Sequence, residues 1–489
     1  MGEFSKTQTS YRILTLLIVV GSCIRVLVCF QHNPLDYLWS DPLRHWLNAG
    51  RFPKGGYMAA ADPILYQVYL FGLRKLTGDN RILIALASAA LSVLMPWTYY
   101  RAARDFGLRK IPALWVWALI VWTPSLIAIY HYIMMETLLL ALEGTALWMT
   151  ARYLRKGGRA AFLICVFCWT LTCLTKPTVI PLAGICLLWA LWKRTPSVKD
   201  LGPAVALSAV LLLPQAIRSE VELGFLAPFG NPWLTKIQHR SGARTTYLNF
   251  YPGTSALFPS HTNSDEQQWI FNSPSCGIRP LWPLSSWAIR RARGNSRVTV
   301  TVHADRGAKD WRDAYAGLNV GWNEWFAQWG ENVVLFFFSP SWPEIERANQ
   351  WDGKLEYLAR WMWAPLIVFV LAYNGREFLH RRFELIPVAV TVFTLFLAFQ
   401  NVATAEGRYR KPLEPLLLLN AIWVVARERD THNRLERNLE SVSRPPDRGP
   451  AESLKPSAQL SRRYRQVDIL FGARMNGFCG HPVKPKYSV

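Results

Sequence analysis

The stretch ILTLLIVVGSCIRVLVCF, residues 13–30, is long and apolar enough to cross a lipid bilayer. A transmembrane helix needs about 17 to 25 predominantly apolar residues. A short polar start that contains Lys6 and Arg12 precedes the stretch, and no small-residue cleavage pattern follows it. We therefore predict an uncleaved first transmembrane span and not a signal peptide.

Similar apolar runs recur along the chain, and the overall composition agrees with them. Of the 489 residues, 51% are hydrophobic and 23 are Trp, which is more than a typical soluble protein contains. The predicted spans cover residues 13–30, 82–100, 111–130, 132–153, 161–174, 178–192, 201–217, 358–373, 385–401 and 413–426. The predicted fold class is therefore an all-α integral membrane protein with about ten transmembrane helices.

The positions of the basic residues predict the orientation of the chain. The formal net charge is +22, but Lys and Arg fall mainly in short connections and in the tail, which is the charge pattern of cytoplasmic loops and not of a nucleic-acid-binding protein. The connections at 101–110 and 152–159 are strongly basic, whereas residues 218–356 are nearly neutral. We therefore predict that both termini are cytoplasmic and that residues 31–81 and 218–356 are external.

The chain divides into four predicted parts. Residues 1–217 form a transmembrane module with a long first external loop (31–81), residues 218–356 a large external loop between spans seven and eight, residues 357–426 the C-terminal transmembrane helices, and residues 427–489 a basic, partly disordered cytoplasmic tail. The sequence lacks a glycosylation sequon, which favours a multi-pass protein of the bacterial inner membrane.

The large external loop has two halves of different character. Its first half is rich in Pro, Gly, Ser and Asn and is expected to be irregular. Its second half, residues 309–338, is amphipathic, with Trp322, Trp325 and Trp329 at helical spacing. This spacing predicts either a helix on the outer leaflet or a Trp stripe that packs against the membrane helices.

Acidic side chains in and beside the external segments are the candidate catalytic groups. Asp41, in Leu38-Trp39-Ser40-Asp41-Pro42, is either a general base or the cap of a short helix that begins at Pro42. Asp62, before Pro63, is a candidate substrate-binding acid. Glu136 is a second catalytic candidate, although an acid also suits the start of a helix. Glu143 lies two turns deeper, where an acid is costly in lipid unless it faces a polar cavity.

Basic side chains at the external ends of spans are the candidate phosphate ligands. Lys176 stands alone in the turn between spans five and six, where it either holds a phosphate or extends to the interface. A second group, which consists of Arg408, Tyr409, Arg410 and Lys411, lies before span ten. Three cations on the external side are unexpected, because Lys and Arg are normally enriched in cytoplasmic loops. These cations either bind an anion or anchor the helix at the interface.

An external acid and external cations together favour transfer from a lipid-linked phosphate donor. The acid would deprotonate an incoming hydroxyl, and the cations would stabilise the leaving phosphate. No Gly-rich nucleotide-binding loop is present. A transporter or flippase of lipid-linked sugars, or a polysaccharide polymerase or ligase, remains an alternative; a transporter often shows duplicated halves, which this sequence lacks.

Four short motifs, in this order and topology, resemble those of GT-C membrane glycosyltransferases, in the group of the protein O-mannosyltransferases and the lipid A aminoarabinose transferase. The motifs are Ser40-Asp41, Glu136 at the start of span four, Leu174-Thr175-Lys176, and Glu406-Gly407-Arg408-Tyr409-Arg410. The resemblance covers the chain up to its tail.

The resemblance implies a polyprenyl- or dolichyl-phosphate sugar donor and an inverting single displacement with Asp41 as the base. It also implies that Lys176, Arg408 and Arg410 bind the donor phosphate, with Tyr409 beside them. Pro42 stands where several relatives carry a second acid, and the sequence does not require a divalent metal. The acceptor would be a hydroxyl of a lipid, a glycan or a protein on the external face.

Overall fold

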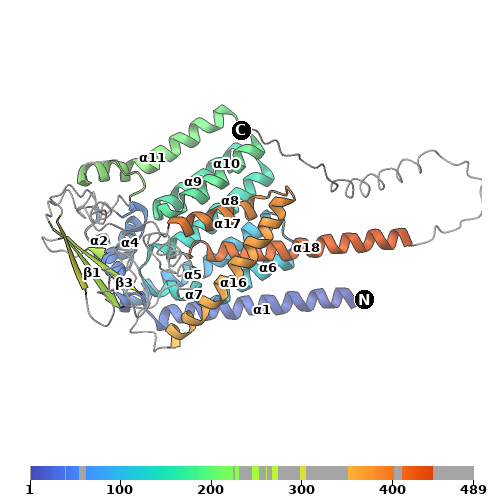
Figure 1. The fold of residues 1–489 in the computed structure, drawn as a ribbon, viewed down its shortest axis with the longest axis horizontal. Helices are drawn as coiled ribbons and strands as arrows, with labels where there is room; N and C mark the ends of the chain where they lie inside the picture. Colours follow the sequence, from blue (N-terminus) through green and yellow to red (C-terminus); the bar gives the residue numbers. More distant parts are fainter. Residues whose placement is uncertain are drawn as a thin grey trace, which may run out of the picture. The chain divides into compact units, whose positions relative to one another are not determined.

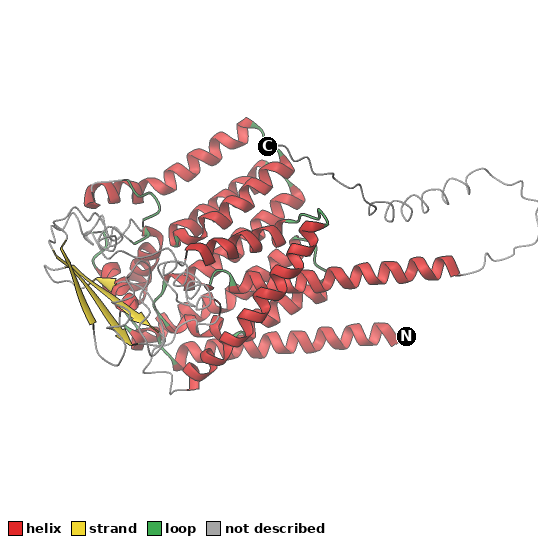
Figure 2. Ribbon diagram, viewed as in Figure 1, coloured by secondary structure: helices red, strands yellow, loops and turns green. Residues whose placement is uncertain are grey.

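The computed structural model describes most of the predicted membrane region and shorter parts of the large loop. The described residues are 2–38, 40–53, 62–223, 226–230, 245–252, 260–261, 267–273, 298–303, 337, 351–400 and 410–443. Within them, helices dominate (Figures 1 and 2).

A long helix covers each predicted span, although several helices extend beyond the apolar run. These helices are α1 (Gly2–Gln31), α5 (Arg81–Asp105), α6 (Lys110–Trp122) with α7 (Pro124–Ala128), α8 (Met135–Lys156), α9 (Arg159–Thr175), α10 (Ile180–Arg194), α11 (Val198–Leu223), α16 (Trp351–Leu379), α17 (Leu385–Gln400) and α18 (Glu414–Ser443). Helices α5, α8 and α18 end in polar turns that follow their apolar runs.

Length and apolarity identify membrane spans among these helices. Within the described residues, Gln8–Gln31, Arg81–Asp105 and Val198–Val221 are each long and apolar enough to cross a bilayer. The pair α6 and α7, followed by η2 (Ile129–His131), adds a fourth candidate that is bent by 63°. The structure therefore supports a multi-span membrane protein, and the count of about ten spans stays a prediction.

The bend between α6 and α7 has a local cause. Pro124 lacks a backbone N–H, so the helix cannot continue through it without losing hydrogen bonds. The last carbonyl groups of α6 consequently lose their regular i→i−4 partners, although the Ile120 carbonyl still accepts a long hydrogen bond of 3.4 Å from the Thr123 N–H. Carbonyl groups in this position need another donor, because lipid supplies none.

Arg25 of α1 supplies that donor. Its fully buried guanidinium donates to the carbonyl oxygens of Ile120 (2.6 Å), Val121 (2.8 Å) and Leu126 (3.1 Å). It also donates to both the carbonyl and the hydroxyl oxygen of Ser92 on α5. One side chain therefore joins α1, α5, α6 and α7 at the point where the membrane helix breaks.

Helices α5 and α8 pack closely at the centre of the described helices. A side chain at Gly144 of α8 would place its Cβ 2.2 Å from the Thr98 hydroxyl and 2.8 Å from the Tyr99 ring of α5. Only Gly therefore allows this approach. Helix α8 also packs against α9, and α1 packs against α5 and α6, which fixes the direction of α8 and of the side chains at both of its ends.

The first half of the large loop, which was predicted to be irregular, contains a four-stranded sheet instead. Its strands are β1 (Thr245–Pro252), β2 (Ser260–His261), β3 (Gln267–Ser273) and β4 (Val298–His303), in the order β2-β3-β1-β4. Strand β1 pairs parallel with β3 and antiparallel with β4. Strand β4 reads VTVTVH, and this alternation of β-branched residues favours a strand despite the surrounding Pro and Gly.

Two other sequence predictions concern the C-terminal tail and the second half of the large loop. The tail was predicted to begin in disorder after Ala426, but α18 remains helical to Ser443. The predicted amphipathic helix at 309–338, with its three Trp residues, lies outside the described residues apart from Phe337.

The role of Arg25 predicts a large loss of stability on its replacement. The variant Arg25→Met keeps the length and the apolar stem but removes the guanidinium hydrogen bonds to three buried carbonyl groups and to Ser92, so we expect the free energy of unfolding to fall by about 3 kcal/mol. Denaturant unfolding in detergent micelles measures this loss. The exposed Arg12 of the same helix is the matched control, and equal stability of Arg25→Met and Arg12→Met would contradict the role.

Candidate functional site

The first external segment forms a small helical unit beside the start of α8. Helix α2 (Ser40–Gly50) packs against α4 (Ile64–Thr77), the helix that was predicted after Pro63. Trp46 and Tyr66 form an apolar cluster with Ile133, which lies just before α8. This cluster places polar residues of α2 and α4 next to the first turn of α8.

Asp41 lies in the first turn of α2 and is half-buried. The helix begins at Ser40 and not at Pro42, so Asp41 lies inside the first turn instead of ahead of it. The Arg44 guanidinium donates to Asp41 Oδ1 at 3.0 Å and to Asp62 Oδ1 at 2.9 Å. One arginine therefore links the two acids that the sequence analysis selected.

Asp62 is more deeply buried than Asp41, with 9% of its side chain exposed against 30%. His45 Nδ1 lies 3.5 Å from Asp62 Oδ2. Burial raises the pKa of Asp62, but the Arg44 guanidinium and His45 outweigh it and lower this pKa below its ordinary value. Asp62 is therefore ionised at neutral pH and shares Arg44 with Asp41.

Tyr66 connects this group to α8. Its ring meets the His45 ring edge-on, with centroids 5.4 Å apart. Burial raises the pKa of the Tyr66 hydroxyl well above its ordinary value, and the nearby Glu136 carboxylate raises it further, while the Thr137 hydroxyl interacts with it. Tyr66 therefore remains a neutral phenol that lies between the first external segment and the start of α8.

Glu136 and Lys176 form a buried ion pair at the start of α8. The Lys176 ammonium donates to Glu136 Oε1 at 2.6 Å, and the two side chains are 8% and 1% exposed. Lys176 follows α9 in extended conformation, and Pro177 begins the 3-10 helix η3 (Pro177–Val179). Lys176 is therefore not a lone external cation, as the sequence suggested, but the partner of the second candidate acid.

The chain after α11 also reaches this group. Arg218 near the end of α11 donates to the side chain of Gln67 on α4 at 2.9 Å. The backbone of Gly230 lies so close to Asp62 and Pro63 that a Cβ there would be 2.9 Å from the Pro63 nitrogen. The first residues of the large loop are thus held next to Asp62.

Arg410 and Lys411 lie in a second buried cluster, centred on Glu414 at the start of α18. Glu414 pairs with Arg410 at 3.3 Å and with Lys411 at 3.7 Å, and it accepts a hydrogen bond from the Ser125 hydroxyl of α7 at 2.8 Å. Arg410 also donates to the carbonyl oxygen of Phe337. Arg408 and Tyr409, which the sequence analysis placed beside them, lie outside the described residues.

Glu143 lies apart from both groups. It is fully buried in α8, two turns below Glu136, where it faces Tyr99 of α5 and Cys186 of α10. From the sequence, we expected an acid at this depth to face a polar cavity. In the structure, Glu143 is instead buried among the packed helices.

The structure therefore joins four of the predicted site residues and separates others. Contacts run from Asp41 through Arg44, Asp62 and His45 to Tyr66, and the Tyr66 hydroxyl lies near enough to the Glu136–Lys176 pair to interact electrostatically with Glu136. Arg410 and Lys411 belong to the Glu414 cluster instead. Within the described residues no group of three His, Cys, Asp or Glu side chains could hold a metal ion.

Sequence reasoning missed several members of these groups. Arg44 lies three residues after Asp41 and Glu414 four residues after Arg410, and helix spacing makes such pairs neighbours. That signal was available for both. No local signal pointed to His45 or Tyr66, because their partners come from other helices.

Comparisons with known proteins match part of the chain. Residues 62–217 match the family model described as dolichyl-phosphate-mannose-protein mannosyltransferase. The match includes Asp62, Glu136, Glu143 and Lys176 and begins after Asp41. No curated protein matches the chain.

Among solved structures, the S. cerevisiae protein O-mannosyltransferase Pmt1-Pmt2 complex bound to the sugar donor is similar to part of the chain. The identity is 16% and the TM-score 0.32, over 51% of this chain and 40% of that chain. The similarity thus spans less than half of the length of that protein.

The apolar helices support an integral membrane protein, and residues 62–217 are similar to the dolichyl-phosphate-mannose-protein mannosyltransferases. This agrees with the resemblance that the motifs predicted from the sequence.

The buried pair predicts a coupled effect on stability. Lys176→Met or Glu136→Gln alone leaves one buried charge or acceptor uncompensated, so we expect each to cost about 3 kcal/mol of unfolding free energy. We expect the double variant to cost less than the sum of the two by about 1 to 3 kcal/mol. Chemical unfolding in detergent of the wild type, the two single variants and the double variant gives the four unfolding free energies.

The exposed pair of Arg376 and Glu428, 3.2 Å apart and half exposed, is the control for this cycle. Surface pairs contribute little, so the variants Arg376→Met and Glu428→Gln should be nearly additive. Equal coupling in the two pairs would show that burial of Lys176 and Glu136 has no special effect.

The lowered pKa of Asp62 predicts a pH dependence of stability. A carboxylate whose folded pKa lies below its unfolded value of about 3.9 stabilises the fold above that value and loses this contribution as the pH falls through the folded pKa. Asp62→Asn should therefore be less stable than wild type at pH 7, and the difference should shrink below about pH 4. Melting curves between pH 7 and 3 test this, and a difference independent of pH would contradict it.

Proposed function

We propose that the protein transfers a sugar from a polyprenyl-phosphate donor to an acceptor hydroxyl on the external, periplasmic face of the membrane. In this proposal the protein is a multi-pass component of the bacterial inner membrane with both termini cytoplasmic. Its site is the group of residues between Asp41 and Lys176.

The observation that carries the proposal is the grouping of Asp41, Arg44, Asp62, His45 and Tyr66, through direct contacts, with the Glu136–Lys176 pair, which interacts electrostatically with Tyr66. An acid with 30% of its side chain exposed lies at one end of this group, and a cation lies at the other. Most of the group falls inside the range that matches the mannosyltransferase family model. A site of this kind provides the two functions that transfer from a sugar phosphate needs, which are a base for the hydroxyl and a positive charge for the phosphate.

Asp41 is the proposed general base. Its carboxylate accepts the proton of the acceptor hydroxyl while the oxygen of that hydroxyl attacks the anomeric carbon. The bond between that carbon and the donor phosphate oxygen breaks, and the phosphate leaves with the bonding electrons. Attack from the face opposite to the leaving group inverts the anomeric configuration. Arg44, held by Asp62, orients the Asp41 carboxylate.

Lys176 is the proposed ligand of the donor phosphate nearest to this base. Its ammonium group carries the positive charge that a leaving phosphate needs. In this role Glu136 orients the cation. Arg408, Arg410 and Lys411 are the further phosphate ligands that we propose, with Tyr409 packed beside them, because guanidinium and ammonium groups bind phosphate oxygens well. Arg410 and Lys411 would act from the Glu414 cluster.

The family description suggests which substrates to test first. It names a mannose donor linked to dolichyl phosphate and a protein acceptor. We therefore propose mannose on a polyprenyl phosphate as the donor and a Ser or Thr hydroxyl of a protein as the first acceptor to examine. A lipid or glycan hydroxyl is the next acceptor.

The variant Asp41→Asn tests the proposed base. Asn is nearly the same size but cannot accept the proton, so we expect transfer from a radiolabelled polyprenyl-phosphate mannose to fall by about 10²- to 10⁴-fold. Donor binding and the melting temperature should change little, because Asp41 is half exposed. The assay uses the purified protein in liposomes and follows both bond cleavage and acceptor labelling.

Asp36→Asn is the matched control, since Asp36 is an exposed acid of the same external segment, on the 3-10 helix η1 (Pro34–Tyr37), and pairs with Arg81. It should keep full activity. Equal losses of stability and activity in Asp41→Asn would assign Asp41 a structural role. Movement of the labelled lipid across the bilayer without bond cleavage would identify a transporter and overturn the proposed reaction.

A further inference from the structure

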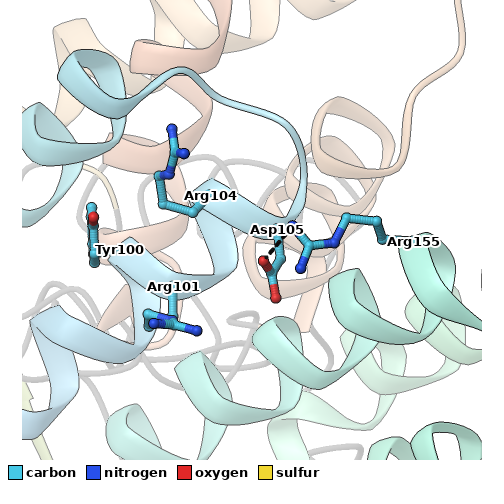
Figure 3. Close-up of a pocket in the computed structure, with 5 residues that line it drawn as sticks. All are labelled: Tyr100, Arg101, Arg104, Asp105 and Arg155. Atoms are coloured by element: carbon cyan, nitrogen blue, oxygen red, sulfur yellow. Dashed lines mark ion pairs between the residues drawn. The ribbon is translucent and has the colours of Figure 1, made fainter.

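A polar pocket lies at the opposite end of α5 and α8 from the proposed transfer site. Its volume is about 250 Å3, and its lining consists of Tyr100, Arg101, Arg104, Asp105 and Arg155. Figure 3 shows the first four side chains on α5 and Arg155 on the neighbouring α8, with the ion pair between Asp105 and Arg155. Neither the family match nor the proposed reaction gives these residues a role.

The pocket carries excess positive charge. The carboxylate of Asp105 pairs with Arg155 at 3.0 Å and accepts a hydrogen bond from Trp148 Nε1 at 2.9 Å. Arg104 donates to the carbonyl oxygen of Leu108, which carries no charge. Among the described residues, neither Arg101 nor Arg104 forms an ion pair, so two of the three arginines lack a compensating acid.

Arg101 is the most constrained of these arginines. Its guanidinium lies 4.8 Å from the ring centroid of Trp148 and 5.8 Å from that of Trp97. Its Nε is buried and has no hydrogen-bond partner in the described part of the chain. A buried donor without a partner is costly, and an anion in the pocket would satisfy it.

The position of the pocket suggests where such an anion comes from. Helix rise, about 1.5 Å per residue, puts Arg155 about 28 Å from Glu136 along α8, which is close to the thickness of the hydrocarbon core. The pocket thus lies at the membrane surface opposite to the transfer site. Trp97 and Trp148, which flank Arg101, are of the type enriched at that interface.

We propose that this pocket binds the phosphate of an anionic phospholipid headgroup on the cytoplasmic face. A phosphodiester offers several acceptor oxygens to the arginine donors, and planar guanidinium groups bind phosphate in two-point contacts. Basic pockets between membrane helices on this side are suited to anionic lipids. Asp105 holds Arg155 at the rim, and Arg101 and Arg104 bind the phosphate.

Phosphatidylglycerol is the probe for the test. The full-length protein in neutral detergent is titrated with phosphatidylglycerol or with phosphatidylcholine, and its melting temperature is followed. We expect phosphatidylglycerol to raise the melting temperature of the wild type more than phosphatidylcholine does. In Arg101→Gln and Arg104→Gln the half-effective concentration should rise about tenfold, since each loses charge-assisted hydrogen bonds.

Lys156→Gln is the matched control, because Lys156 is an exposed cation in the last turn of α8 outside the pocket. Its titration should resemble the wild type. The melting temperatures without lipid separate a folding defect from a binding defect, and native mass spectrometry counts retained lipid in variants that are less stable.

Two results would overturn the proposal. One is an equal response of the wild type and both arginine variants to phosphatidylglycerol. The other is a response of the wild type to inorganic phosphate that matches its response to the lipid, which would assign the pocket to a soluble anion. Neither readout depends on sugar transfer, so this test is independent of the proposed reaction.

Discussion

A break in a membrane helix leaves backbone carbonyl groups that lipid cannot satisfy, and the arrangement of this protein depends on how Arg25 solves that problem. Its guanidinium makes five hydrogen bonds at the junction of α6 and α7. The break in turn frees residues 124–134 to change direction before α8 begins. Each polar cluster contacts this part of the chain. Ser125, within the segment, donates a hydrogen bond to Glu414, and Glu136, in the first turn of α8, accepts one from Lys176.

The two clusters share a physical design. Each cation that the sequence analysis assigned to phosphate binding, and that the structure describes, is already paired with a buried carboxylate. A buried charge without a partner would be unstable, so the pairs keep the cations in place without ligand. They also limit how much positive charge is offered to a donor, because part of it is already neutralised.

The sequence predicted the helices better than the contacts between them. Apolar length alone located α5 and α9, and Pro63 located the start of α4. The Val and Thr alternation of β4 was also readable, but the Pro- and Gly-rich surroundings obscured it. Arg25 appears in the sequence only as one charge within an apolar run, and its carbonyl partners lie about a hundred residues away. The pairing of Lys176 with Glu136 is similarly invisible, since it depends on how α8 and α9 pack.

The close approach of Gly230 to Asp62 and Pro63 has a consequence for the large loop. The φ angle of Gly230 is +70°, and the neighbouring backbone leaves no room for a side chain, so this anchor tolerates no other residue. A chain segment tethered at a fixed point acts as a ligand at high effective concentration. Any group that the loop carries is therefore kept at high effective concentration beside Asp62 and Arg44, to a degree set by the length of chain between that group and Gly230.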